Sequence, residues 1–308
     1  MNEFELIHRL TQDLPRHPGV VVGAGDDCAV LDLGLPDRWV LFKTDAVVEG
    51  VHFDADALPE QIGHKALARC LSDVAAMGGE ASSALVTLGL PPTFDVARIE
   101  GAYRGLNALA ARHGVAIVGG ETTTNPDRLL LSISLLGWVE KTRCVTRSGA
   151  RPGDALFVSG ALGGSLRGRH LCFEPRMIEA RWLTGHFAVH AMIDLSDGLA
   201  GDLRHLLEAS RVGAELLAAA IPISREAKRA AREGPDAKSA LSSALTDGED
   251  FELLFSVASR DAVPLLDAWK ERFPDLGLAC IGKIVAERGV RLRDHRGVRP
   301  LEDRKSVG

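Results

Sequence analysis

The chain has 308 residues, 46% of them hydrophobic and 25% charged, a composition that supports one large hydrophobic core or two ordinary ones. The net charge of −6 gives no indication of nucleic-acid binding. No apolar run approaches the roughly 18 residues that span a bilayer, and the N-terminus lacks the basic start and apolar core of a signal peptide, so we expect a cytoplasmic protein with neither a membrane nor a nucleic acid as partner.

The first half of the chain mixes helical and strand patterns. In chain order, the patterns predict a helix over residues 2–14, a strand over 39–44, a helix over 59–77, a strand over 83–90, a helix over 94–113, and strands over 115–118 and 129–139. Glycine or proline ends most of these segments. The mixture of elements predicts an α/β or α+β architecture.

A polar stretch that contains glycine and proline, residues 147–154, predicts a domain boundary. We therefore expect an N-terminal domain over residues 1–146 and a C-terminal domain over 147–308. The predicted elements after the boundary are a strand over 155–159, a helix over 175–184, a strand over 189–193, a helix over 199–210, helices within 224–246, a strand over 251–257, a helix over 259–272 and a strand over 278–285. The polar tail after about Asp294 is expected to be frayed.

Acidic residues recur where strands or turns meet glycine. They are Asp26, Asp27, Asp45, Glu121, Asp194, Asp197, Asp247, Glu249 and Asp250. Any one of these motifs could be a plain turn, because Asp and Gly are common in turns for local reasons. Their repetition past apolar strands favours a ligand site, since α/β proteins collect ligand groups at strand ends. Such a cluster suits an anionic substrate if Mg²⁺ ions lie between the carboxylates and the substrate.

Two further features are weaker when they are read alone. The helical periodicity of Leu71 and Val74 places Asp73 on the opposite side, which predicts a solvated position for its carboxylate. Gly119-Gly120 follows a predicted strand and would let the backbone approach a phosphate closely. This glycine pair matches neither of the common nucleotide-binding glycine patterns, so it indicates a phosphate site only weakly.

Eight short motifs form an ordered set along the chain. They are Gly25-Asp-Asp-Cys-Ala, Thr44-Asp45 with Val48-Glu-Gly-Val-His-Phe53, Lys65-Ala-Leu-Ala68, Leu71-Ser-Asp-Val-Ala-Ala-Met-Gly78, Gly119-Gly-Glu-Thr-Thr123, Thr146-Arg-Ser-Gly-Ala-Arg-Pro-Gly-Asp154, Asp194-Leu-Ser-Asp-Gly-Leu199 and Gly248-Glu-Asp-Phe-Glu-Leu253. From residue 3 to about 285, this set resembles the thiamine-monophosphate kinases, a family within the aminoimidazole-ribonucleotide synthetase superfamily.

The resemblance implies a two-domain α/β (α+β) fold of the aminoimidazole-ribonucleotide synthetase type. The N-terminal sheet would meet that of a second copy in a homodimer with a barrel-like interface, and the C-terminal α/β domain would close over the nucleotide. The implied reaction transfers the γ-phosphoryl group of ATP directly onto thiamine monophosphate. It would use several Mg²⁺ ions, and no side chain would act as a general acid or base.

The resemblance also assigns roles to residues at the matching positions. The Mg²⁺ ligands would be Asp27, Thr44, Asp45, Asp73, Glu121, Asp194 and Asp197. ATP would be contacted by Tyr103, Gly120, Glu121, Arg147 and Ser196, and thiamine monophosphate by His52 and Glu249.

Four features depart from the family pattern. Glu121 stands where the family has Asp, and Lys43 replaces a small hydroxyl residue beside Thr44. The segment 163–176 is short, and residues 300–308 lack the aromatic side chains that help to hold the thiamine ring. These departures leave two alternatives open. One is a related kinase for another small phosphorylated metabolite, and the other is a non-catalytic nucleotide-binding protein.

Overall fold

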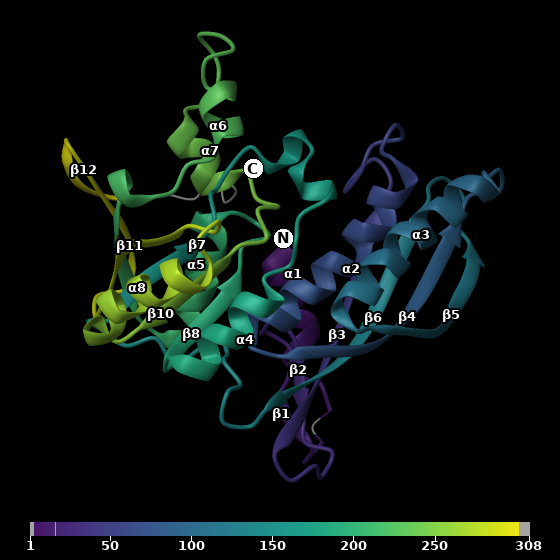
Figure 1. Cartoon of the computed structure of the whole chain (residues 1–308), viewed down its shortest axis with the longest axis horizontal. Helices are drawn as coiled ribbons and strands as arrows, with labels where there is room; N and C mark the ends of the chain where they lie inside the picture. Colours follow the sequence, from purple (N-terminus) through teal and green to yellow (C-terminus); the bar gives the residue numbers. More distant parts are fainter. Residues whose placement is uncertain (1–2, 16, 302–308) are drawn as a thin grey trace.

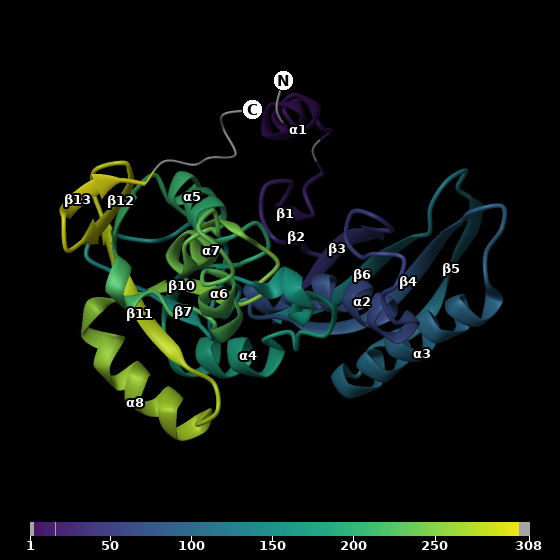
Figure 2. The same cartoon turned by 90° about the horizontal axis from the view of Figure 1, so that it is seen from above.

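Two β-sheets organise the chain, which is described here from a computed structural model that covers residues 3–15 and 17–301. The first sheet is built from strands before residue 141 and the second from strands after residue 154. The two sheets lie side by side, each with helices packed against it (Figures 1 and 2). This arrangement confirms the expected mixture of helices and strands in two parts.

The first sheet has six strands in the order β1-β2-β3-β6-β4-β5. They are β1 (Val20–Val22), β2 (Ala29–Leu31), β3 (Arg38–Val48), β4 (Glu80–Leu90), β5 (Ala116–Thr124) and β6 (Leu130–Glu140). Neighbouring strands are antiparallel except β4 and β5, which are parallel. Burial alternates along β6 because only one face of the sheet is fully covered. Helices α2 (Pro59–Ala76) and α3 (Val96–His113) contact this sheet and each other.

The second sheet has seven strands in the order β13-β12-β9-β11-β7-β10-β8. They are β7 (Ala155–Ser159), β8 (Val189–Asp194), β9 (Gly213–Leu217), β10 (Leu253–Val257), β11 (Leu278–Val285), β12 (Gly289–Asp294) and β13 (Gly297–Pro300). Every residue of the neighbouring strands β7 and β10 is buried. The remaining helices are α1 (Glu3–Thr11), α4 (Met177–His186), α5 (Leu199–Ser210), α6 (Arg225–Ala230), α7 (Ala240–Thr246) and α8 (Ala262–Arg272).

Helix α2 lies between the two halves of the molecule. It contacts β3, β4 and β6 of the first sheet, and also α4, β8 and the short 3₁₀ helix Arg169–Leu171 of the second half. The hydrophobic cluster around α2 is continuous across both halves, since it includes Leu41 and Leu67 as well as Phe157 and Phe255. Elements from distant parts of the chain therefore cover α2 on more than one side.

This position overturns the expectation that Asp73 is solvated. Asp73 is only 7% exposed, and its neighbour Ser72 is 2% exposed. Periodicity identified the apolar stripe of α2 correctly, but it cannot report a second layer that covers the polar side of the same helix.

Several predicted bounds differ from the structure. Strand β3 continues to Val48, so Asp45 lies within a strand and not after it. Strand β5 runs through Gly119 and Gly120 to Thr124, because it pairs in parallel with β4 along its length. The helices predicted within 224–246 are α6 and α7, which are separated by a segment that contains Gly234 and Pro235.

The prediction of a frayed tail after Asp294 was wrong for Gly297–Pro300. This segment pairs with β12 as strand β13. Residues 302–308 lie outside the described part of the chain. Strands β1, β2, β9 and β12 were not predicted. Within the described residues, no helix has the length and apolarity needed to cross a bilayer. The cytoplasmic location stays a prediction.

Candidate active site

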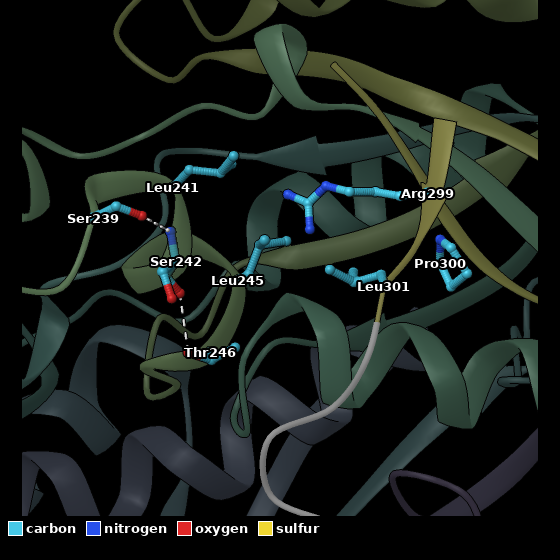
Figure 3. A pocket seen from close by; sticks show the side chains of 8 residues that line it. All are labelled: Ser239, Leu241, Ser242, Leu245, Thr246, Arg299, Pro300 and Leu301. Carbon is cyan, nitrogen blue, oxygen red and sulfur yellow. Dashed lines mark hydrogen bonds between the residues drawn. The ribbon is translucent and has the colours of Figure 1, made fainter. Parts of the chain in front are cut away.

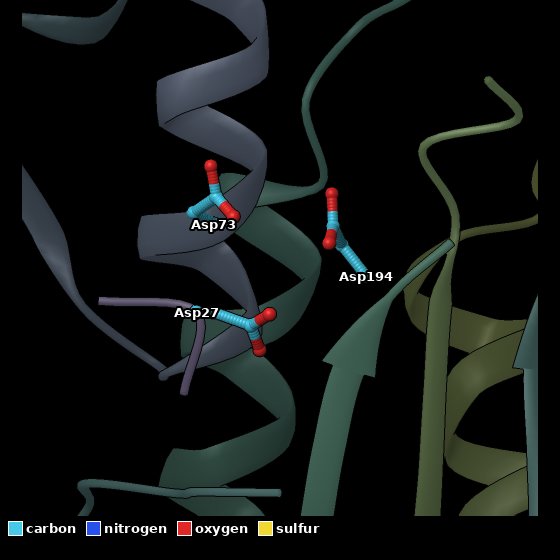
Figure 4. Close-up of side chains that lie close together, drawn as sticks. All are labelled: Asp27, Asp73 and Asp194. Atoms are coloured by element: carbon cyan, nitrogen blue, oxygen red, sulfur yellow. The ribbon is translucent and has the colours of Figure 1, made fainter. Parts of the chain in front are cut away.

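Three carboxylates from distant parts of the chain converge between the two halves (Figure 4). Asp27 comes from the loop before β2, Asp73 from α2, and Asp194 from the end of β8. One oxygen of each lies within 4.8 Å of the others, and all three side chains are buried. The structure thus brings together Asp27, Asp73 and Asp194 from the predicted set of Mg²⁺ ligands.

Each carboxylate has a different partner. The Arg147 guanidinium donates from Nη2 to Oδ1 of Asp27 at 2.5 Å. The Lys43 ammonium lies 2.9 Å from Oδ1 of Asp73. The Asp194 carboxylate accepts a hydrogen bond at 2.6 Å from the hydroxyl of Ser72. Two of the three carboxylates are therefore paired with cations of the protein itself.

The cluster is nevertheless short of positive charge. Burial raises the pKa of Asp27 to about 6, although Arg147 acts in the opposite direction. Burial and the charge of Asp27 raise the pKa of Asp194 to about 6, and burial raises that of Asp73 well above its usual value. A cation bound between these groups would stabilise their ionised forms.

The residues present fit Mg²⁺. Carboxylate oxygens are the hard ligands that this ion prefers. Oδ2 of Asp27 is buried and has no hydrogen-bond partner among the described residues, although buried polar atoms are almost always paired. An atom of this kind, on a carboxylate grouped with two others, is typical of a metal ligand.

A second polar cluster lies one and two turns before Asp73 on the same face of α2. The Lys65 ammonium contacts Glu249 and His170, with its Nζ 2.7 Å from Nδ1 of the histidine. The Arg69 guanidinium lies 3.3 Å from Asp45 and 3.2 Å from Glu249. Arg69 therefore bridges a predicted metal ligand and a predicted substrate residue.

Glu249 is held as a carboxylate by this second cluster. Burial alone would raise its pKa, but His170, Lys65 and Arg69 together lower it to about 2. His52 joins the cluster through its backbone, because its carbonyl accepts from Lys65 at 2.6 Å. The two residues that were predicted to face thiamine monophosphate thus share Lys65 as a partner.

Two loops of the second half are joined by hydrogen bonds that fix the positions of Glu249 and Ser196 relative to each other. The Glu249 amide donates to the carbonyl of Ser196 at 2.7 Å, and the Phe251 amide donates to that of Leu195 at 2.7 Å. Glu249 and Phe251 have φ angles of 55° and 50°, a region that residues other than glycine rarely occupy. The two loops also approach closely at Gly248, where a Cβ would lie 2.8 Å from the carbonyl oxygen of Ser196.

Asp197 lies in the same turn, and its side chain is exposed. Its amide donates to Oδ2 of Asp202 at 3.0 Å, and the next amide, that of Gly198, donates to the same oxygen at 3.1 Å. Asp202 is a buried carboxylate of α5 that was not predicted to belong to the site. The signal that could have found it is an acidic residue in the first turn of a helix, where it can accept free amides.

Four predicted residues lie apart from the carboxylate cluster. Thr44 points to the face of β3 opposite Lys43, where its hydroxyl accepts from Ser134 at 3.4 Å. Glu121 and Gly120 are exposed on β5, and Tyr103 is partly buried on α3. Across residues 3–15 and 17–301, no hydrogen bond or ion pair joins these four to the three carboxylates. Their roles stay predictions.

A separate cavity of about 540 Å³ lies between α7 and β13 (Figure 3). Its lining includes the hydroxyls of Ser239, Ser242 and Thr246 and the side chain of Arg299. None of the three clustered carboxylates belongs to this lining. We therefore place the candidate chemistry at the cluster and not in this cavity.

Comparison with known families agrees with the two-sheet architecture. Residues 25–139 match the AIR synthase related protein, N-terminal domain, and residues 151–295 match the corresponding C-terminal domain. The E. coli hydrogenase maturation protein HypE shares the fold, with a TM-score of 0.72 and 22% identity over 98% of both chains.

The curated relatives and solved structures are more specific. The chain is 43% identical to thiamine-monophosphate kinase of Rhodopirellula baltica, covering 89% of this chain and 86% of that one. It is 35% identical to the enzyme of the same name from Bacillus subtilis, with 85% of both chains covered. The structure of AaThiL complexed with AMPPCP and TMP superposes with a TM-score of 0.80 at 30% identity, covering 97% of this chain and 94% of that one. Over most of its length, the chain belongs to the thiamine-monophosphate kinase family.

Proposed function

We propose that this protein catalyses the ATP- and Mg²⁺-dependent phosphorylation of thiamine monophosphate to thiamine diphosphate. The observation that carries the proposal is the convergence of Asp27, Asp73 and Asp194, with one buried oxygen of Asp27 left without a partner among the described residues. The relatives named above support the substrate pair, since one solved relative is complexed with AMPPCP and TMP.

The reaction requires mainly that the negative charges of the two phosphate groups are neutralised and that these groups are aligned. The attacking group is already an anionic phosphate oxygen, so no strong general base is required. Two unit charges 4 Å apart repel by ~1 kcal/mol in water and by ~4 kcal/mol at an effective dielectric constant of 20. Mg²⁺ bound by Asp27, Asp73 and Asp194 would neutralise charge on the transferred phosphoryl group.

The chain's own cations would contribute to the same task. Arg147 lies beside Asp27 with 22% of its side chain exposed, so it can also offer donors to an ATP phosphate. Arg69 is held between Asp45 and Glu249 by contacts of 3.2–3.4 Å, which are long for charged hydrogen bonds. Its donors would be available to the acceptor phosphate, which would leave Asp45 free to bind metal.

We also propose a homodimer formed through the first sheet. Phe42 and Leu136 are paired across β3 and β6 on the face turned away from α2, and Leu85 lies on the same face of β4. They are 47%, 43% and 47% exposed respectively. A contiguous exposed apolar face is typical of an interaction surface, and a second copy of the sheet would match it in shape and polarity.

The direct test is a product analysis. Purified protein is incubated with ATP, MgCl₂ and thiamine monophosphate, and the products are separated by chromatography. We expect thiamine diphosphate to form only when both ATP and Mg²⁺ are present. If thiamine diphosphate does not form, other phosphorylated metabolites are screened as acceptors. Formation of ADP with one of them would point to a different acceptor. Nucleotide binding without any turnover would point to a non-catalytic protein.

A further inference from the structure

Lys43 occupies an unusual place for a lysine. It lies on the same face of β3 as Leu41, Asp45 and Val47, because these positions alternate with Thr44 along the strand. That face is covered by α2, and only 21% of the Lys43 side chain is exposed. The side chain is thus directed into the interior of the molecule, toward the carboxylate cluster and not toward solvent.

Lys43 contacts one member of the cluster directly. Its Nζ lies 2.9 Å from Oδ1 of Asp73, and the Asp73 carboxylate is one of the three that converge with Asp27 and Asp194. An ammonium that holds Asp73 therefore competes with any metal ion that needs this carboxylate. It also places a positive charge close to the position where that ion would bind.

We propose that Lys43 is a resident cation of the cluster, which holds Asp73 and weakens the binding of free divalent metal. The proposal rests on the metal site of the proposed function. Its consequence is that metal loading becomes coupled to the nucleotide. A bound triphosphate adds negative charge and oxygen ligands of its own, so the unfavourable effect of Lys43 on the metal is offset only when nucleotide is present.

Lys43 and Arg147 contact different carboxylates of the cluster. Arg147 contacts Asp27, whose second oxygen is still without a partner among the described residues, so Asp27 keeps an atom for the metal. Asp73 is the carboxylate whose charge an internal ammonium partly neutralises. Removal of Lys43 is therefore expected to change the affinity of the cluster for metal and to leave the contact between Arg147 and Asp27 in place.

The test measures binding of Mn²⁺ alone, by calorimetry or by electron paramagnetic resonance, to the full chain without nucleotide. We expect Lys43→Met to bind Mn²⁺ about ten-fold more tightly than the wild type, or better, since one positive charge is removed next to the site. Lys43→Arg keeps the charge and is expected to match the wild type. Lys141→Met is the control, because Lys141 pairs with Asp32 at 3.3 Å outside the cluster.

A second variant keeps the proposal open to refutation if Lys43→Met does not fold. Lys43→Gln retains a hydrogen-bond donor to Asp73 without the charge, and it should show the same gain in Mn²⁺ affinity. With AMPPCP present, the difference between wild type and variant should shrink. Unchanged or weaker Mn²⁺ binding by folded Lys43→Met or Lys43→Gln would overturn the proposal.

The outcome is independent of turnover. A wild-type protein that makes no thiamine diphosphate, together with a gain in Mn²⁺ affinity on removal of Lys43, would refute the proposed function alone. Formation of thiamine diphosphate by the wild type, with no effect of Lys43 on Mn²⁺ binding, would refute the role of Lys43 alone.

Discussion

At the scale of single residues, the partner of each clustered carboxylate decides what a substitution would do. Asp27 is paired with Arg147 and Asp73 with Lys43, so neutralising either would leave a cation without its partner. Asp194 instead accepts from the neutral hydroxyl of Ser72. A substitution of Asp194 therefore leaves no cation unpaired, so its effect on metal binding can be measured without a large loss of folding stability.

We expect Asp194→Asn to reduce kcat by about 100-fold or more without loss of stability in the metal-free protein, because the neutral amide removes the charge whose burial raises the pKa of Asp194. The amide oxygen can still accept from Ser72, but it is a poorer Mg²⁺ ligand than a carboxylate. Steady-state kinetics and urea unfolding would check both parts. Ser72→Ala is the matched control, and it should lose about 1 kcal/mol of stability from the missing hydrogen bond and retain most of its activity. An active Asp194→Asn enzyme would contradict the metal assignment.

The raised pKa values predict how stability depends on pH in the absence of metal. The pKa values of Asp27 and Asp194 are raised from 3.8 to about 6 in the folded chain. In the pH range between these two values, the folded state therefore binds protons that the unfolded state releases. Stability of the metal-free protein should therefore increase as pH falls from 7 toward 5 through these groups. The Tm in EDTA at pH 7 and pH 5.5 would show this, with a smaller rise for Asp194→Asn. A Tm difference equal in both proteins would contradict it.

At the scale of elements, the close crossing of α2 and α3 positions Asp73. Two glycines make this approach possible. A Cβ on Gly63 would lie 1.7 Å from the carbonyl oxygen of Ala102, and one on Gly105 would lie 1.8 Å from that of Glu60. Since neither contact is possible for a real side chain, any larger residue must push the two helices apart.

Gly63→Ala should therefore destabilise the protein by about 1–3 kcal/mol, and the movement of α2 should also lower activity. Urea unfolding and kinetics on the same preparation would measure both effects. Gly185→Ala in α4 is the matched control, because there the nearest atom to an added Cβ lies 3.5 Å away, and alanine should stabilise the helix by about 0.5–1 kcal/mol. Equal stability of the two variants would contradict the packing argument.

At the scale of the whole molecule, the site exists only because the two halves share a core. Asp27 and Asp73 belong to the first half and Asp194 to the second, and α2 touches both sheets. The buried hydrophobic cluster that surrounds α2 includes residues from both sides, such as Leu71 and Phe255. A movement of one half relative to the other would therefore change the spacing of the carboxylates.

The proposed dimer is also a property of this scale. Leu136→Lys places a charge in the middle of the uncovered sheet face, and we expect it to convert dimers to monomers in size-exclusion chromatography with light scattering. Leu33→Lys is the control, because Leu33 is 67% exposed in the loop between β2 and β3. A wild-type protein that is monomeric at micromolar concentration would refute the dimer.

Local sequence patterns were sufficient for much of the fold. Strand β7 and helix α5 begin and end where periodicity and flanking glycines predict them, since these signals are carried by neighbouring residues. Strand β1 was missed because three residues carry too little periodicity to be recognised alone, and β12 because its sequence, GVRLRD, lacks the apolar run that marks β7. The ordered acidic motifs carried the family resemblance through which Asp27 and Asp194 were predicted as ligands, and the structure brings these two residues together. Their role as ligands stays a prediction.

Only the tertiary structure decided which groups meet. The pair formed by Lys65 and Glu249 joins residues 184 positions apart, and no local pattern reports such a contact. The burial of Asp73 and its contact with Lys43 depend on the second layer that covers α2, whereas helical periodicity records only the apolar face. The sequence by itself determined most of the elements, the family and the acidic character of the candidate site. The contacts between distant segments decided how those acidic residues are charged, paired and placed, because electrostatics in a buried site depends on every group that the fold brings near.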